Sequence, residues 1–457
     1  MKRLFGTDGI RGVAGTSPLD QVTVRCVGIA LGEEIVSSGH PPRVVVGRDT
    51  RESGSWIAEA LISALCGAGV DKVHDVGVIT TPGLAFITRC YGFELGIMIS
   101  ASHNPYRDNG IKIFSKDGAK LTDARESKLE NRICELVSCG LPCLAPERNQ
   151  GHYSQDLIEK YQSFLCSHFE GKLDGFQIGL DLCNGSAFRL APKIFEMLGA
   201  KTTVVNNTPN GRNINEGCGS LYPQGLAALI TGRHLHFGVA FDGDADRSIF
   251  VDSRGRLFDG DYVLHALSGY FKERGLLKSK KVVGTVMTNL ALEKALEAKG
   301  LELVRTAVGD KYVLDAMEST GANLGGEPSG HIILRDYHTT GDGILTALQL
   351  CQVMCDLNVC LDDLADEYHP FPQTLEGLRV RRKIQISDLP AARKAIEEAE
   401  RELGNSGRVL VRYSGTEPVL RIMAEGEDAD EVNALVMRLR SRLEVAFSTI
   451  GEEIHSI

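Results

Sequence analysis

Three aspartates stand at alternate positions in the segment Phe241-Asp-Gly-Asp-Ala-Asp-Arg247, directly after an apolar run. In an extended backbone alternate residues share one side, so the carboxylates of Asp242, Asp244 and Asp246 can converge. Three like charges so close repel one another unless a cation neutralises them, and oxygen ligands select a hard cation such as Mg²⁺ or Ca²⁺. The spacing therefore favours a metal site over a solvated acidic turn, with Arg247 as a partner of the carboxylates.

A second segment that could do chemistry is Ser100-Ala-Ser-His-Asn-Pro-Tyr-Arg-Asp-Asn-Gly110. It lies between two short β-branched runs, 97–99 and 111–114, that are typical of strands. Proteins of the α/β class place their ligands at strand ends, and this segment presents Ser102 and His103 there, with Lys112 nearby. Serine is a weak nucleophile until a neighbour activates it. Considered alone, the segment is explained somewhat better as a turn without chemistry.

Two further segments combine glycines with polar side chains. Gly6-Thr-Asp-Gly-Ile-Arg-Gly12 indicates a loop whose backbone needs freedom or approaches a ligand closely, and Arg11 is either an anion contact or a solvated turn arginine. Gly325-Gly-Glu-Pro-Ser-Gly-His331 offers Glu327 and Ser329 for sugar hydroxyls and His331 for proton transfer near neutral pH. A Gly/Pro turn with a surface histidine explains this last segment better when it is considered alone.

The last polar segment is Arg412-Tyr-Ser-Gly-Thr-Glu-Pro418, between two apolar runs. The side chains of Arg412, Ser414 and Thr416, with backbone N–H groups around Gly415, could cradle a phosphate. Arg421 would add positive charge. A plain hairpin turn is about as good an explanation of this segment alone.

These segments are positioned by strands and helices that alternate along the chain, which predicts βαβ units and largely parallel sheets. The alternation occurs three times, and a final βαββα order predicts a smaller α+β domain that begins near His369-Pro-Phe-Pro372. Besides the two runs named above, the expected strands are 43–47, 73–78, 177–182, 201–205, 236–241, 281–286, one near Leu303, 375–386, 409–412 and 419–424. The expected helices are 22–37, 55–67, one opening at Asn184, one from about 256 to 272, one from Leu290, 390–403 and 430–447.

Composition limits the classes of function. The formal net charge of −10 over 457 residues argues against a nucleic-acid partner, and an anionic substrate needs a local cationic pocket. The 12 cysteines show no zinc spacing, and Cys351, Cys355 and Cys360 are expected to be buried helical thiols. Scattered thiols in a large α/β chain indicate the cytoplasm. No signal peptide and no apolar run of about 18 residues is present, so a membrane span is not expected.

In combination, these segments carry more weight than any one of them. A nucleophilic serine loop, an acidic metal loop, a Glu-Ser-His loop and a phosphate loop, in that order, resemble the α-D-phosphohexomutase superfamily, and bacterial phosphoglucosamine mutases in particular. The resemblance to phosphoglucosamine mutases rests on three segments: residues 6–12, Ile99-Ser-Ala-Ser-His-Asn-Pro-Tyr106 and Asn213-Ile-Asn-Glu-Gly-Cys-Gly-Ser220. It implies an α/β fold with three related mixed α/β domains and a C-terminal smaller α+β domain around a central cleft. The expected domains are 1–155, 156–255, 256–368 and 369–457.

The resemblance implies interconversion of glucosamine 6-phosphate and glucosamine 1-phosphate, for UDP-N-acetylglucosamine and cell-wall precursor synthesis. A 1,6-bisphosphate of glucosamine would be the intermediate, and this compound or glucose 1,6-bisphosphate would be the activator. A homodimer is expected only on this ground. One Mg²⁺ per chain would be the cofactor, held by Asp242, Asp244, Asp246 and phosphorylated Ser102. The implied residues around the reacting centre are Arg11, His103, Lys112 and His331. The implied substrate-binding residues are Arg247, then Glu327 and Ser329 on the sugar, and Arg412, Ser414, Gly415, Thr416 and Arg421 on the phosphate.

Three positions depart from the family's pattern. Pro328 stands where glutamine is expected, Tyr413 where proline is expected, and Ala245 where glycine is expected, which should limit positive φ in the acidic segment. Pro328 neighbours the implied sugar contacts, so a phosphomannomutase or phosphoglucomutase of the same fold stays open. A non-catalytic sugar-phosphate sensor and a Mg²⁺ phosphatase are the rivals from other classes. The choice between His331 and Lys112 as main proton carrier also stays open.

Overall fold

The computed structural model describes residues 4–6, 8–39, 43–140, 151–414, 418–450 and 455–456. The chain forms two compact units, one of residues 1–288 and 299–367 and one of residues 289–298 and 368–457. Helix α9 (Leu290–Ala298) therefore belongs to the second unit, although the strand after it belongs to the first. Within the described part of the chain, no helix is both long enough and apolar enough to cross a bilayer.

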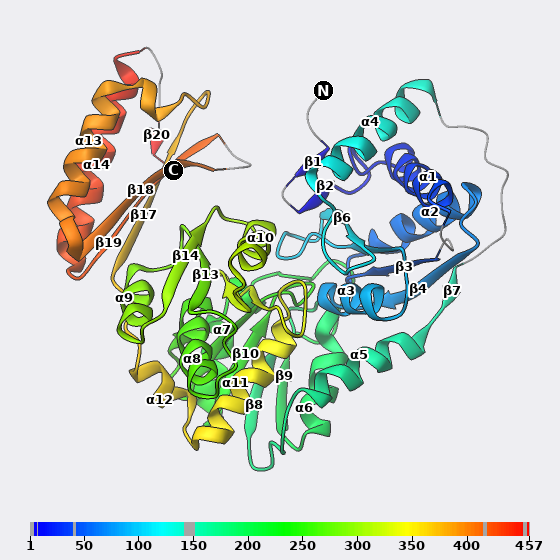
Figure 1. The fold of residues 1–457 in the computed structure, drawn as a ribbon, viewed down its shortest axis with the longest axis horizontal. Coiled ribbons are helices and arrows are strands. Elements are labelled where there is room, and N and C mark those ends of the chain that lie inside the picture. Colours follow the sequence, from blue (N-terminus) through cyan, green and yellow to red (C-terminus); the bar gives the residue numbers. More distant parts are fainter. Residues whose placement is uncertain are drawn as a thin grey trace. The chain divides into compact units, whose positions relative to one another are not determined.

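The first sheet of the larger unit is mixed. Its elements are β1 (Phe5–Gly6), β2 (Gly9–Val13), α1 (Gln21–Ser37), β3 (Arg43–Arg48), α2 (Gly54–Gly67), β4 (Lys72–Val78), α3 (Thr81–Cys90), β5 (Leu95–Ile99), β6 (Asp108–Ser115), α4 (Asp123–Cys139) and β7 (His152–Tyr153). The strand order is β1-β2-β6-β5-β3-β4-β7. Strands β5, β3, β4 and β7 are parallel, and β6, β2 and β1 continue the sheet antiparallel. Helices α1, α2 and α4 gather on one side of this sheet and α3 on the other (Figure 1).

The second sheet repeats this plan with fewer strands. Its elements are α5 (Gln155–Ser167), β8 (Gln177–Asp181), α6 (Leu190–Met197), β9 (Lys201–Val205), α7 (Gln224–Arg233), β10 (Phe237–Phe241), β11 (Ser248–Asp252) and β12 (Leu257–Phe258). The strand order is β12-β11-β10-β8-β9, with β10, β8 and β9 parallel and β11 antiparallel to β10. The helix expected to open at Asn184 begins as a short 3-10 turn at Ser186 and becomes α6 at Leu190.

The third sheet follows the same plan again. Its elements are α8 (Gly260–Glu273), β13 (Lys281–Thr285), β14 (Glu302–Thr306), α10 (Asp310–Thr320), β15 (Leu324–Gly326), β16 (Ile332–Leu334), α11 (Gly343–Leu357) and α12 (Leu361–Asp366). The order is β14-β13-β15-β16, in which only β16 is antiparallel to its neighbour among the described strands. The three sheets therefore share a parallel part and an antiparallel edge.

The hairpins at these antiparallel edges carry the polar segments singled out from the sequence. The serine loop (residues 100–110, with the first residues of β6) joins β5 to β6, and the acidic loop (residues 242–246) lies between β10 and β11. The glutamate loop (residues 325–331, with the last residues of β15) joins β15 to β16. Each loop follows the carboxyl end of a parallel strand, which is where α/β sheets place ligands. The same position in three sheets thus presents three different sets of side chains.

The smaller unit is an antiparallel sheet with helices against it. It contains β17 (Gln373–Arg379), α13 (Pro390–Leu403), β18 (Gly407–Tyr413), β19 (Val419–Gly426), α14 (Ala429–Ser448) and β20 (His455–Ser456), in the strand order β18-β19-β17-β20. Its core comes from α13, α14 and the sheet. The expected strand 375–386 is too long, because β17 ends where Arg379 pairs with Val419, the first residue of its partner β19.

Two further expectations about local structure are wrong. The opening glycine-rich segment is not a loop throughout, since Gly9–Val13 is strand β2, and Arg11 lies on it opposite Gly110 of β6. Gly9 serves close approach of the two strands, because a Cβ there would lie 2.3 Å from the carbonyl oxygen of Ile111. Of the three thiols, Cys351 is buried and Cys355 half-buried, but Cys360 is exposed and stands at the N-cap of α12.

Candidate active site

Ser102 lies at the entrance of the serine loop in an unusual backbone conformation. Its φ of 51° is in the left-handed region, which non-glycine residues adopt mainly where the surrounding structure enforces it. The hydroxyl is buried and donates a hydrogen bond to Oδ2 of Asp242 at 2.6 Å. Because that bond uses the only hydroxyl proton, the contact of 3.2 Å with His103 has Nδ1 of the imidazole as the donor. Burial lowers the pKa of His103 to about 4, with Arg247 and Arg11 adding to the effect, so His103 is neutral near pH 7.

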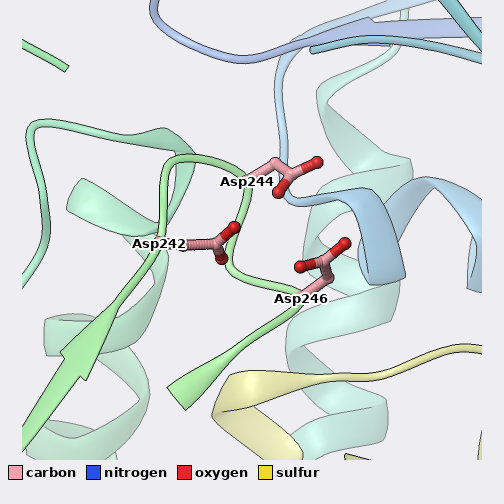
Figure 2. Close-up of side chains that lie close together, drawn as sticks. All are labelled: Asp242, Asp244 and Asp246. Atoms are coloured by element: carbon pink, nitrogen blue, oxygen red, sulfur yellow. The ribbon is translucent and has the colours of Figure 1, made fainter. Parts of the chain in front are cut away.

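The three carboxylates of the acidic loop converge as their spacing predicts. Asp242, Asp244 and Asp246 are buried, and one oxygen of each lies within 4.8 Å of the others (Figure 2). Oδ1 of Asp244 and Oδ1 of Asp246 are buried without a hydrogen-bond partner. Buried carboxylate oxygens without donors are costly unless a cation binds them. These residues therefore fit a hard divalent ion such as Mg²⁺.

Ala245, between the last two of these aspartates, corrects one expectation. Its φ is 56°, so the loop adopts a positive φ without glycine. Two backbone hydrogen bonds hold this turn: the N–H of Ala245 donates to the carbonyl oxygen of Asp242 at 3.1 Å, and the N–H of Gly343 donates to the carbonyl oxygen of Ala245 at 3.0 Å. The second bond comes from the start of α11, in the third sheet region, and so offsets the conformational cost.

The acidic residues differ in how readily they ionise. Burial raises the pKa of Asp242 well above its usual range, and the neighbouring charges of Asp246 and Asp244 add to this. Burial opposes ionisation of Asp246 as well, but Lys112, His331 and Arg247 outweigh it and hold its pKa well below the usual range. A bound cation would remove the remaining repulsion at Asp242.

Lys112 projects from β6 into the acidic loop and is completely enclosed. Its Nζ lies 2.8 Å from Oδ2 of Asp244, 3.3 Å from Oδ2 of Asp246 and 3.2 Å from Oδ2 of Asp8. Burial opposes the charge, but Asp244, Asp8 and Asp246 outweigh it and raise the pKa of Lys112 well above its usual value. Asp8 also contacts Nη2 of Arg11 and Nζ of Lys120. The first sheet region therefore brings Lys112 and Arg11 beside the acidic loop, and Asp8 links Lys120 to them.

Arg247 and His331 lie on the remaining sides of Asp246. Nε of Arg247 is 3.8 Å and Nδ1 of His331 is 3.7 Å from Oδ1 of Asp246. Nε2 of His331 accepts a hydrogen bond from the N–H of Gly341 at 3.0 Å, which leaves the proton of a neutral ring on Nδ1, facing Asp246. The histidine is therefore buried and oriented, in contrast to the surface histidine of the alternative interpretation.

The glutamate loop holds its two polar side chains in place. Oε1 of Glu327 accepts from the N–H of Gly309 at 2.9 Å, and Oε2 accepts from the hydroxyl of Ser329 at 3.3 Å. The carbonyl of Pro328 accepts from the N–H of Gly260 at 3.1 Å, and a Cβ on Gly260 would lie 1.9 Å from the carbonyl oxygen of Glu327. The start of α8 thus packs against the backbone of the glutamate loop and holds it in place.

The expected phosphate-binding residues lie in the smaller unit. Arg412 and Arg421 are direct partners across β18 and β19, and burial together with Arg421 lowers the pKa of Arg412. The N–H of Ser414 donates to the carbonyl oxygen of Val419 at 2.8 Å, which closes the hairpin. Gly415 and Thr416 lie outside the described residues.

Sequence reasoning missed three residues that contact this site. Thr81, at the start of α3, donates from its hydroxyl to Oδ2 of Asp244 at 2.5 Å and from its N–H to the carbonyl oxygen of Asp244 at 3.0 Å. Lys120 bridges Asp8 of the first sheet region to Oδ2 of Asp310, which lies 2.6 Å from its Nζ in the third. Asp8 shares its glycine-rich segment with Arg11 and could have been noticed there, but nothing local marks Thr81 or Lys120.

Comparison with known proteins identifies the family. Models of the phosphoglucomutase/phosphomannomutase family match in four pieces: α/β/α domain I at residues 2–137, domain II at 153–255, domain III at 259–371 and the C-terminal domain at 377–442. Phosphoglucosamine mutase of Solibacter usitatus is 47% identical over 433 residues, covering 95% of this chain and 96% of the relative. That of Myxococcus xanthus is 45% identical and covers 98% of each chain. The chain belongs to the phosphoglucosamine mutases of this family. It is accordingly a member of a family of mutases, which are isomerases.

Solved structures of the wider family share the fold. A phosphoglucomutase/phosphomannomutase family protein from Burkholderia thailandensis superimposes with a TM-score of 0.80 at 25% identity, covering 98% of each chain. Aspergillus fumigatus N-acetylphosphoglucosamine mutase, solved in complex with GlcNAc-6P and magnesium, has a TM-score of 0.64 at 17% identity and covers 97% of this chain and 96% of that one. Three mixed α/β sheets and a C-terminal α+β unit are thus the family's architecture, as the sequence predicts.

Proposed function

We propose that this protein interconverts glucosamine 6-phosphate and glucosamine 1-phosphate, and so supplies UDP-N-acetylglucosamine and cell-wall precursor synthesis. The observation that carries the proposal is the hydroxyl of Ser102, 2.6 Å from Oδ2 of Asp242 in a carboxylate cluster in which two buried oxygens accept no hydrogen bond. A serine in that position suits phosphoryl transfer beside a divalent cation. The names of relatives that match almost the whole chain support the amino sugar as substrate.

The cofactor of this proposal is one Mg²⁺ per chain. Asp242, Asp244 and Asp246 would hold it, together with an oxygen on phosphorylated Ser102. Mg²⁺ commonly binds a few carboxylates and completes its shell with phosphate or water, which suits the two buried oxygens that accept no hydrogen bond. When bound, the ion would offset negative charge on the phosphoryl group during transfer.

In the first half of the reaction, phosphorylated Ser102 would give its phosphoryl group to the free sugar hydroxyl. The bond between phosphorus and the Ser102 oxygen breaks, a bond to the sugar oxygen forms, and the hydroxyl proton goes to a nearby base. Of the two expected proton carriers, Lys112 is held in its charged form by Asp244, Asp8 and Asp246, so His331 is the proposed base. The product is glucosamine 1,6-bisphosphate. Arg11, Lys112 and Arg247 would balance charge on the phosphoryl oxygens, while neutral His103 donates to Oγ of Ser102.

In the second half the bisphosphate would turn around, and Ser102 would take back the other phosphoryl group. Glu327 and Ser329 would hold the sugar hydroxyls in both orientations. Arg412, Ser414, Gly415, Thr416 and Arg421 would hold the phosphate that is not transferred. Arg412 and Arg421 support this role, because they pair directly across two neighbouring strands and so place two guanidinium groups where a phosphate can bind both.

Several finer points belong to the same proposal. Glucosamine or glucose 1,6-bisphosphate would act as activator by restoring phosphorylated Ser102. The four-domain division 1–155, 156–255, 256–368 and 369–457 assigns one loop to each domain. A homodimer and a cytoplasmic location are expected as well.

The test is a coupled assay of Mg²⁺-dependent conversion of glucosamine 6-phosphate, primed with a trace of 1,6-bisphosphate. Ser102→Ala is assayed beside the unmodified protein, and mannose and glucose phosphates serve as competitors. Turnover that disappears in Ser102→Ala supports both the reaction and the nucleophile. Turnover of mannose or glucose phosphates alone would replace the substrate, with Pro328 as the first residue to exchange. Stoichiometric phosphate release would indicate a phosphatase, and binding without any isomerisation would indicate a sensor.

A further inference from the structure

The backbone of Ser102 is held from both sides. Its N–H donates to Oγ of Ser100 at 2.9 Å. Its carbonyl oxygen accepts two hydrogen bonds, one from Nη2 of Arg51 at 2.9 Å and one from Nδ2 of Asn215 at 2.8 Å. A residue with a left-handed φ of 51° persists only where such contacts outweigh its strain. These contacts therefore determine where the Ser102 hydroxyl points.

Arg51 is buried, and its guanidinium makes five hydrogen bonds. An arginine has five N–H groups, so all of them are used. Nε donates to Oδ2 of Asp49 at 2.8 Å, and that carboxylate also accepts from Oγ of Ser100 at 2.7 Å. The other four bonds end on backbone carbonyl oxygens of the serine loop, those of Ser102, Asn104, Pro105 and Asp108. These bonds connect four residues in a closed ring: Ser102, Ser100, Asp49 and Arg51. The ring includes both the N–H and the carbonyl oxygen of Ser102.

Asn215 makes a matching contact from the second sheet region. Its Nδ2 donates to the carbonyl oxygens of Ser102 at 2.8 Å and Asn104 at 2.9 Å, the same two that Nη2 of Arg51 bonds. Its Oδ1 accepts from the thiol of buried Cys183, with 2.8 Å between the sulfur and the oxygen. The thiol contact orients the amide, because only its nitrogen can donate to carbonyl oxygens.

We propose that Arg51 and Asn215 are positioning residues, which keep Ser102 in one backbone conformation before and after phosphoryl transfer. This inference rests on the proposed function of Ser102. A phosphorylated serine carries about −1.5 to −2 charges, and the cations beside the acidic loop would pull a loosely held loop toward them. In the described structure, Arg51 and Asn215 bond the Ser102 carbonyl and leave its hydroxyl to Asp242 and His103. Arg51 and Asn215 therefore act on the position of the Ser102 hydroxyl and do not contact it.

The test compares Arg51→Lys and Asn215→Ala with matched controls remote from the serine loop. Arg305→Lys is the first control, since Nη1 of Arg305 bonds the carbonyl oxygens of Thr285 at 3.2 Å and Thr288 at 2.6 Å. Asn323→Ala is the second, since buried Asn323 bonds the carbonyl oxygen of Leu276 at 2.9 Å and Oδ2 of Asp336 at 2.7 Å. A misplaced serine should lower kcat for glucosamine 6-phosphate by about 100-fold in Arg51→Lys and in Asn215→Ala, but not in the two controls. KM should change by less than about threefold, because the sugar and phosphate contacts remain.

Hydrogen exchange of the backbone amides in residues 99–110 is the second measurement. We expect faster exchange in Arg51→Lys and Asn215→Ala than in the unmodified protein and in both controls. Unchanged kcat, or exchange no faster than in Asn323→Ala, would overturn the positioning role. If the unmodified protein isomerises no hexose phosphate while the two variants still exchange faster, the proposed function fails and the hold on the Ser102 backbone stands.

Discussion

His338 donates a hydrogen bond from Nε2 to the carbonyl oxygen of Pro82 at 2.8 Å, and so joins the segment before α11 to the first turn of α3. Its Nδ1 accepts from the N–H of Thr339 at 2.9 Å, which sets this tautomer. Burial lowers the pKa of His338 to about 3, and the charge of Arg89 adds to the effect. The neutral imidazole is therefore part of the contact between the first and third sheet regions.

This contact predicts a loss of stability in acid. The pKa of His338 is lower in the folded state, so its contribution is complete above the unfolded pKa of about 6.5 and declines as pH falls toward about 3. From pH 7 to pH 5 the loss should be about 2 kcal/mol. His338→Gln removes the titration, so its free energy of unfolding should depend less on pH. Urea unfolding at both pH values measures this, with exposed His152→Gln as control. Equal pH dependence in His338→Gln and the unmodified protein would contradict the prediction.

Thr81→Val should weaken the proposed Mg²⁺ site. The hydroxyl of Thr81 orients Asp244 through a 2.5 Å hydrogen bond, and loss of such a partner typically reduces metal affinity by about 10- to 100-fold. The measurement is the Mg²⁺ concentration for half-maximal activity, together with calorimetric Mg²⁺ binding. Thr88→Val is the control, because the buried hydroxyl of Thr88, on the same helix, bonds only the carbonyl oxygen of Leu84 among its described partners. Equal Mg²⁺ affinity in both variants would rule out this role.

Gly341→Ala should displace His331 from Asp246. A Cβ at this position would lie 2.7 Å from the carbonyl oxygen of Asp246 and 2.7 Å from Cδ2 of His331, both in well-packed surroundings. We expect kcat to fall by about 100-fold. The control is Gly232→Ala on α7, where a Cβ meets nothing within 4 Å and alanine should stabilise the helix by up to about 1 kcal/mol. A Gly341→Ala variant as active as the control would show that the ring can move without consequence.

Tyr161→Phe should destabilise the protein more at neutral pH than in mild acid. The buried Tyr161 hydroxyl donates to Oδ2 of Asp342 at 2.6 Å. Burial raises the pKa of Asp342 to about 6, so its carboxylate form is disfavoured in the folded state and stability declines as pH rises from about 4 to 6. Because the hydroxyl offsets this cost, its loss should amount to about 1.5–3 kcal/mol above pH 6 and less below pH 5.

Thermal unfolding at both pH values measures the effect of Tyr161→Phe. Tyr270→Phe is the control, since its hydroxyl donates at 2.6 Å to Asp356, which is partly exposed and can bond water instead. A loss for Tyr161→Phe that is no larger at pH 7 than at pH 5 would count against the assigned role of Asp342.

The parts of this structure that could be predicted from sequence depend on neighbours along the chain. Helix α13 begins at Pro390 and ends before Gly404, as those residues predict. The aspartates of the acidic loop converge because alternate residues share a side. Lys112 is predicted near the site because it follows the serine loop after a single residue of the expected strand. In each case the signal lies within about ten residues, where backbone geometry is restricted.

The contacts that escaped prediction join residues far apart in the chain. Thr81 and Asp244 are 163 positions apart, and Arg51 and Ser102 are 51 apart. Ala245 adopts a positive φ because Gly343 bonds its carbonyl, and no local pattern announces that support. Arg11 was expected in a loop because glycines surround it, whereas Gly9 serves strand packing. Tertiary contacts decided each of these cases.

The hairpins that carry the three loops restrict how this protein can change during evolution. Met98 of β5 pairs with Lys112 of β6, and the side chains beside it are those of Ile111 and Ile113. Adding one residue to the serine loop would shift this pairing by one position and turn an isoleucine toward the aspartates in place of the lysine. Insertions and deletions in the loops should therefore abolish activity. Substitutions such as that at Pro328 leave the pairing of the strands intact. New sugar preferences would then arise by replacing side chains in loops of constant length.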